Sequence, residues 1–180
     1  MRAVIVRRWT LSERGCGGRV VTGSDDLDEL ARQVIDENRY LTLGTTEPDN
    51  RPRVSPVFFT HAGYRDFYWV SAPAARHSAN IAARPEVAIV IFDSTAPVGA
   101  GRAVYIGAHA AVVTEDDLPQ GCAAAFADVE PGARPFQPHE LSGDAPLRLY
   151  RARATSHEVH IPGRDPTYGT GVDTRRRVSP

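Results

Sequence analysis

The spacing of apolar residues predicts one amphipathic helix before any other clear element. After Ser24, apolar residues recur at the i, i+3, i+4, i+7 and i+8 positions of such a helix: Leu27, Leu30, Ala31, Val34 and Ile35. Acidic residues crowd its first turns, where the helix dipole stabilises negative charge, and Ser24 suits the N-cap. The helix should end near Asn38.

Six later segments have the length and composition of strands. They are residues 40–46, 53–60, 66–71, 87–92, 102–114 and 147–161. The first three are separated by a turn cluster at residues 47–50 and a hairpin turn at residues 61–63, which is typical of an antiparallel meander. Gly107 indicates a bulge or sharp bend within the fifth strand. With further helices at residues 74–84 and 115–128, the pattern predicts a mainly β fold with flanking helices, a six-stranded antiparallel Greek-key-like barrel.

The remaining segments suggest how the chain is divided. Residues 1–23 form an N-terminal extension with a β-like run at Ala3–Val6 and a glycine-rich stretch. Residues 24–162 form the folded domain, within which the proline-rich residues 129–146 are an irregular excursion. Residues 163–180 show no packing pattern, so we expect a mobile C-terminal tail.

The amino-acid composition and charge balance exclude some classes of function. The 180 residues suit one domain, and 21 basic against 22 acidic residues leave a net charge of −1. This balance argues against nucleic-acid binding by broad phosphate neutralisation, although a local basic patch stays open. Every basic residue is Arg, and without lysine the chain has neither lysine Schiff-base chemistry nor a lysine-bearing P-loop.

Motifs for metals, dinucleotides and membranes are missing. Cys16 and Cys122 form no CxxC pair, and His157 and His160 have the wrong spacing for a zinc-binding helix. The glycines at 99–101 lack the third glycine of a dinucleotide fingerprint. No apolar run approaches the ~20 residues of a membrane helix, and the N-terminal run is too short for a signal peptide. We therefore expect a soluble, cytoplasmic protein with no resident metal and no membrane partner.

The start of the second predicted helix is the main candidate for ligand binding. A strand ends at Ser71, and Arg76 and His77 fall in the first turns of the helix that follows. A helix N-terminus presents unpaired N–H groups, and the Arg fork can hold two phosphate oxygens. These residues could form a pocket for one phosphate. A solvated helix start whose arginine binds nothing explains the same pattern equally well.

Four sequence blocks extend this interpretation to a family. They are Asn50–Phe59 (NRPRVSPVFF), Phe67–Ser71 (FYWVS), Arg76–Ile81 (RHSANI) and Arg84–Ala88 (RPEVA). In this order they resemble the pyridoxamine 5′-phosphate oxidase-like superfamily of flavin-binding split barrels, over about residues 25–160. The resemblance implies a split β-barrel that forms a homodimer, with FMN in a groove between the two subunits.

The resemblance also implies which residues bind the cofactor. Arg53, Val54, Ser55 and Pro56 match positions along the flavin ring and ribityl chain. Val70 and Ser71 match the strand end near the phosphate, and Arg76 matches the arginine that clamps it. His77 stands where the family often has lysine. Arg102 stands where the pyridoxine enzymes place a glutamine, and His160 falls near their tryptophan over the flavin.

The same resemblance argues against vitamin B6 as the substrate. The pyridoxine enzymes hold their substrate's phosphate with a lysine after the second strand, where this chain has Phe58-Phe59-Thr60, and with a C-terminal Arg-His pair that it lacks. We expect FMN-dependent hydride transfer to or from a small organic substrate or nicotinamide, with no catalytic side chain assigned. A deazaflavin-dependent reductase and a non-catalytic flavin- or haem-binding module remain alternatives. In the excursion, Phe136 and His139 are the side chains best suited to contact a planar substrate.

Overall fold

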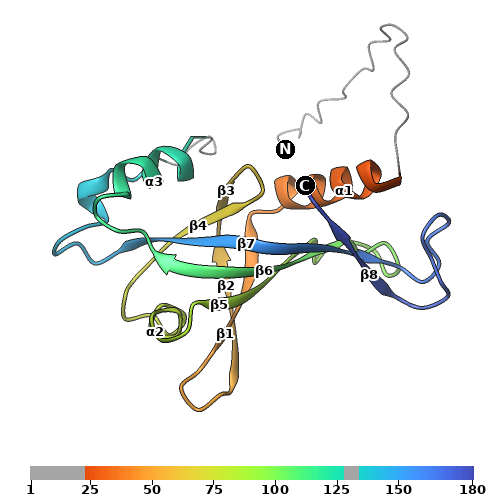
Figure 1. The fold of residues 1–180 in the computed structure, drawn as a ribbon, viewed down its shortest axis with the longest axis horizontal. Coiled ribbons are helices and arrows are strands. Elements are labelled where there is room, and N and C mark those ends of the chain that lie inside the picture. Colours follow the sequence, from red (N-terminus) through yellow and green to blue (C-terminus); the bar gives the residue numbers. More distant parts are fainter. Residues whose placement is uncertain (1–22, 128–133) are drawn as a thin grey trace, which may run out of the picture.

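The computed structural model describes residues 23–127 and 134–180 (Figure 1). The β-like run at residues 3–6 lies outside the described residues. Helix α1 (Gly23–Glu37) confirms the first predicted helix, and its apolar stripe packs into the core, with Ala31 and Ile35 almost fully buried. Among the described residues, no helix is long and apolar enough to cross a membrane.

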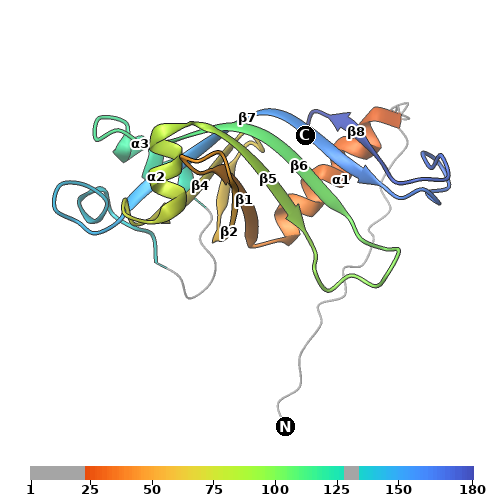
Figure 2. The same cartoon turned by 90° about the horizontal axis from the view of Figure 1, so that it is seen from below.

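All six predicted strands are present. They are β1 (Tyr40–Thr46), β2 (Pro52–Phe58), β4 (Asp66–Ser71), β5 (Glu86–Phe92), β6 (Ala103–Val112) and β7 (Arg148–Ile161). Two short strands, β3 (Thr60–Ala62) and β8 (Thr174–Val178), accompany them. Together they form one antiparallel sheet in the order β2-β1-β5-β6-β7-β4-β3, with β8 also paired to β7. The sheet curls into a half-barrel whose inner face packs against α1 (Figures 1 and 2).

The predicted meander is wrong at its third strand. β1 and β2 form the expected hairpin, but β4 pairs with β7 and β3. The reason is Phe59, which is buried and donates its backbone N–H to the carbonyl of Arg39, so the predicted strand 53–60 breaks there. The hairpin turn also lies later than predicted, at Gly63 and Tyr64, which both have positive φ. Consequently β2 and β3 lie on opposite edges of the sheet, and the barrel is split between them.

The expectation of an unpacked C-terminal tail is wrong for its last residues. β8 pairs with β7, Val178 is buried, and the Arg175 guanidinium lies 3.6 Å from the centroid of the Tyr105 ring. The backbone N–H of Ser179 donates to Asp28 at 2.8 Å. Sequence patterning missed this strand because arginines, not apolar residues, occupy its centre.

Three helices and a bulge complete the architecture. α2 (Arg76–Ala83) and α3 (Leu118–Ala125) fall within the predicted helices, and a 3-10 turn, η1 (Pro138–Glu140), lies in the proline-rich excursion. Residues of α3, β4 and β7, among them Leu118 and Leu149, form a second, smaller core together with Leu141, which follows η1. The register of β6 against β7 shifts after Gly107, which confirms the predicted bulge.

Candidate functional site

A cleft of about 410 Å³ opens at the split of the barrel. One wall is the edge strand β2 and the residue after its bend, and the other is the end of β4 with the first turn of α2. The segment that begins at Arg134 forms a third side of the cleft. The lining residues are Pro56, Val57, Phe58, Thr60, Tyr68, Trp69, Val70, Ser71, His77, Phe126, Arg134, Phe136 and Leu149. This volume and mostly apolar lining are typical of small-molecule sites.

The third side of the cleft is held by charged and aromatic contacts. Arg134 donates two hydrogen bonds to the Glu140 carboxylate, at 2.8 and 2.6 Å, and its guanidinium lies 5.7 Å from the centroid of the Phe136 ring. Phe136 packs against Phe126 with ring centroids 5.9 Å apart. The bonds from Arg134 and from the Gln137 backbone N–H lower the pKa of Glu140 to about 2. Phe136 is therefore held at the cleft, whereas His139 is exposed and does not line it.

Ser71 and His77 meet where β4 leads into α2. The Ser71 hydroxyl oxygen lies 2.8 Å from His77 Nε2. Burial lowers the pKa of His77, so its neutral form dominates at pH 7. At that pH the ring contributes a hydrogen bond to this end of the cleft but no positive charge.

The N-terminus of α2 has the free backbone groups that the sequence predicted. Its N-cap residue, Ala75, is extended, with φ −62° and ψ 142°, and no side chain caps the first turn. The first N–H groups of a helix lack intrahelical partners, so they are available to an anion at this end. The side chain of Arg76 is 60% exposed here, which leaves its guanidinium accessible to a ligand.

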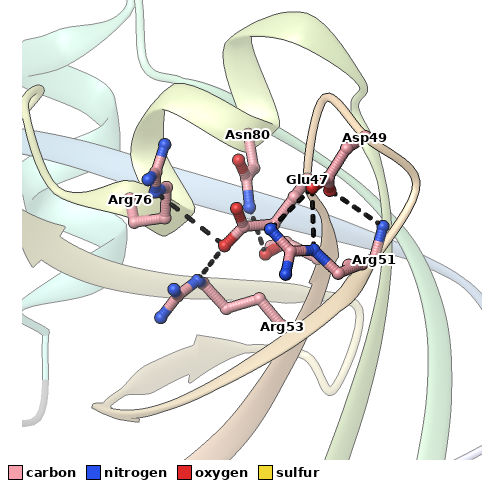
Figure 3. Close-up of polar contacts among 7 residues, drawn as sticks. Glu47, Asp49, Arg51, Arg53, Arg76 and Asn80 are labelled. Atoms are coloured by element: carbon pink, nitrogen blue, oxygen red, sulfur yellow. Dashed lines mark hydrogen bonds and ion pairs between the residues drawn. The ribbon is translucent and has the colours of Figure 1, made fainter.

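Glu47 brings Arg53 and Arg76 together, which sequence analysis missed (Figure 3). Its side chain is only 12% exposed, and Arg53 donates a hydrogen bond from Nε to Oε1. Arg76 Nε approaches the same oxygen at 3.8 Å. The Arg53 hydrogen bond lowers the pKa of Glu47, which is therefore a carboxylate at neutral pH. We call Arg53 and Arg76, held by this carboxylate, the arginine clamp.

Local backbone geometry fixes the position of Glu47. Its carbonyl accepts from the Asn50 N–H, and its own N–H donates to the Arg51 carbonyl, both at 2.9 Å. Asn50 has φ 66°, a left-handed conformation that asparagine tolerates better than most residues. Beneath the turn, Asn80 of α2 donates to the Thr45 hydroxyl at 3.0 Å in a buried contact. The only sequence signal for the clamp was an acidic residue in a turn, six positions before Arg53.

The four predicted β2 residues lie on two faces of the strand. Arg53 and Ser55 pair with Thr45 and Leu43, both of which are buried on the inner face. Val54, between them, is 68% exposed on the outer face. Pro56 lines the cleft at the strand edge.

Comparison with known proteins places the chain in a family. The profile for pyridoxamine 5′-phosphate oxidase matches residues 27–155. The chain belongs to the pyridoxamine 5′-phosphate oxidase family. The order of sequence blocks had indicated this family, and the match confirms it. No curated protein matches the sequence at a significant level.

Solved structures of the same fold carry varied names. A haem-binding protein from Mycobacterium smegmatis is 19% identical with a TM-score of 0.63, covering 88% of this chain and 60% of that one. HutZ, a haem storage protein from Vibrio cholerae, is 20% identical with a TM-score of 0.53, covering 71% and 89%. A Clostridium acetobutylicum protein related to general stress protein 26 is 9% identical with a TM-score of 0.56, covering 85% and 95%. At these identities the likeness shows the fold alone.

The two other residues matched to the pyridoxamine 5′-phosphate oxidase pattern lie in a different pocket of the chain. Arg102 and His160 line a space of about 390 Å³ beside α1 and the β5–β6 loop, which shares no residue with the cleft. Arg102 donates to Gln33 at 3.2 Å, and His160 Nε2 lies 3.8 Å from an Asp173 oxygen. Of the predicted cofactor residues, Pro56, Val70, Ser71 and His77 line the cleft, Arg53 and Arg76 meet at Glu47, and Arg102 and His160 lie apart.

Proposed function

We propose that this protein is an FMN-dependent oxidoreductase of the pyridoxamine 5′-phosphate oxidase family. The observation that supports this function best is the cleft itself. One end of the cleft has Ser71 and His77, next to the uncapped start of α2 that carries Arg76, and the remainder is mostly apolar and partly aromatic. A flavin mononucleotide has the same division, since its phosphate is anionic and its ring system is flat and largely apolar.

The residues present fit such a ligand. Arg76 and the free N–H groups of α2 would hold the phosphate, and Ser71 would contribute a hydroxyl beside it. Val57 and Val70 would enclose the ring and exclude water, and Phe136 would lie on the substrate side of the ring. FMN, when bound, supplies the hydride chemistry, while the protein supplies orientation and a dry pocket. The proposal therefore assigns no side chain as an acid or base.

We propose that a second copy of the chain completes the site. The outer face of β1, β2 and β5 exposes large apolar side chains, with exposed fractions of 62% for Tyr40, 68% for Val54, 46% for Phe58 and 45% for Phe92. Tyr40 and Phe58 are paired across β1 and β2, with ring centroids 5.9 Å apart. Exposed apolar residues that lie together on one face are typical of interaction surfaces, and a twofold dimer is the commonest way to cover them. Light scattering should give twice the 19.6 kDa of one chain, and a monomer with flavin bound would overturn the dimer.

The substrate class follows from what the cleft lacks. The position that carries a lysine in the pyridoxine enzymes has Phe58-Phe59-Thr60 here, so this position offers no cation to a substrate phosphate. We propose a small organic substrate or nicotinamide as the hydride partner of the flavin.

Haem binding is the second candidate. Two proteins of the same fold are named for haem, and His77 places an imidazole within the cleft of this chain. Imidazole nitrogen is a common haem ligand. A deazaflavin coenzyme, which has a similar ring, is a third occupant of the same cleft.

The absorption spectrum of the purified protein separates these candidates. We expect flavin bands and, by mass spectrometry of the released ligand, FMN. A Soret band would favour haem. If the protein is purified colourless, adding FMN should quench flavin fluorescence with saturation near one FMN per chain. No binding of FMN under these conditions would overturn the proposal.

A further inference from the structure

We infer that Glu47 is a counter-ion within the arginine clamp and that its charge limits how tightly the clamp holds a phosphate. The inference rests on the proposed function in one respect only, that Arg76 of the clamp binds an anion. It assigns Glu47 as a specificity-determining residue, separate from the arginines that would touch the ligand.

The geometry places one carboxylate between two cations. Glu47 accepts from Arg53 and lies 3.8 Å from Arg76, on a backbone fixed by the turn to Asn50. The carboxylate is 12% exposed, whereas the side chains of Arg53 and Arg76 are 44% and 60% exposed. Because the carboxylate is the least exposed of the three groups, a ligand entering from solvent meets the guanidinium groups first. Figure 3 shows the Glu47 carboxylate between Arg53 and Arg76.

This arrangement has two opposing consequences. Glu47 holds the two guanidinium groups near one point before any ligand arrives, which reduces the side-chain entropy lost on binding. It also lowers the formal charge of the clamp from +2 to +1, and its negative charge repels the ligand anion. The hydrogen bond to Arg53 needs only an acceptor oxygen, but the repulsion needs the charge.

Glu47→Gln separates these consequences, because glutamine keeps the size and an acceptor oxygen but removes the charge. The dissociation constants for FMN, for riboflavin, which lacks the phosphate, and for inorganic phosphate are measured by fluorescence quenching or calorimetry. We expect FMN and phosphate to bind about tenfold more tightly to the variant, and riboflavin equally well to both proteins. The gain for FMN should shrink at high ionic strength, because salt screens charge interactions.

Asp49→Asn is the matched control. Asp49 lies in the same turn and pairs with Arg51, but its side chain is 50% exposed, and that of Arg51 is 78% exposed. Neutralising this carboxylate changes the net charge of the protein by the same amount. We expect little change in affinity for any of the three ligands, since exposed charges are screened by solvent.

The possible failures are distinguishable. An FMN affinity that is unchanged or weaker in Glu47→Gln would overturn the inference and leave the flavin proposal standing. Equal losses for FMN and riboflavin would mean that Glu47 only supports the fold of the turn. If neither protein binds FMN but the variant binds phosphate more tightly, the inference stands and the flavin proposal falls.

Discussion

The cleft beside α2 and the pocket beside Arg102 contain residues that the family resemblance assigns to one cofactor, yet they are built differently. His77 in the cleft and the neighbouring arginine clamp come from residues 45–80, which run from the end of β1 through β2, β3 and β4 into α2. The other pocket draws on α1, the β5–β6 loop and the end of β7. Figure 2 shows α2 and the β5–β6 loop toward opposite ends of the sheet. If both regions bind one flavin, Arg102 and His160 must come from the second subunit.

Reversing the charge of Arg76 should have the largest effect. In Arg76→Glu a charge-assisted hydrogen bond is replaced by repulsion, and such a bond contributes roughly 1.5–3 kcal/mol. FMN affinity should fall at least ten- to a hundredfold, measured by titrating the apo-protein with fluorescence detection.

Arg84→Glu is the control for this variant. Arg84 lies at the other end of α2 and donates to Asn50 at 2.7 Å. The Arg84→Glu variant should therefore bind FMN with nearly the same affinity as the wild type. Equal affinities in the two variants would mean that the phosphate binds elsewhere, and the assignment of cofactor residues would then have to be withdrawn.

Arg102→Ala tests whether the two regions serve one site. If the partner subunit brings Arg102 to the flavin, loss of about 1 kcal/mol of hydrogen bonding should weaken FMN binding about fivefold. Arg164→Ala, in the same pocket but outside the family pattern, should leave affinity unchanged. Wild-type affinity in Arg102→Ala would confine the cofactor site to the cleft.

Phe136 and His139 give a matched pair within the excursion. Phe136 lines the cleft and His139 does not, so only Phe136→Ala should affect a planar substrate. Aromatic contacts contribute about 0.5–1.5 kcal/mol, which predicts a rise in KM of about twofold to tenfold with flavin content unchanged. His139→Ala should have wild-type kinetics. The reverse result would show that the third side of the cleft is rearranged when substrate binds.

The smallest predicted effect is on the stability of the fold in acid, through Glu140 on the third side of the cleft. Because the folded pKa of Glu140 is about 2, below its ordinary value of 4.5, its ionised form stabilises the fold above pH 4.5. This contribution should disappear as the pH falls from 4.5 toward 2. Urea unfolding of wild type and Glu140→Gln should therefore give midpoints that differ at pH 7 and converge near pH 2, whereas Asp144→Asn should follow wild type. A difference in midpoint that stays the same from pH 7 to pH 2 would contradict the lowered pKa of Glu140.

The sequence by itself determined the secondary-structure elements and much of the cleft beside α2. Apolar spacing located α1 and the six main strands, turn residues located the bend at Glu47, and the block around Arg76 located an uncapped helix start and the family. These features depend on residues within a few positions of one another, so their periods and turn signals are visible in one dimension.

Tertiary structure decided how these elements meet. The bend at Phe59 moves β3 to the far edge of the sheet, and β8 pairs with β7 through a run of arginines that has no apolar pattern. Glu47 reaches Arg76 only because the β1–β2 turn packs against α2, and Arg102 lies in a pocket that shares no residue with the cleft. Such contacts depend on strand register and on packing summed over many distant residues, which no local pattern records.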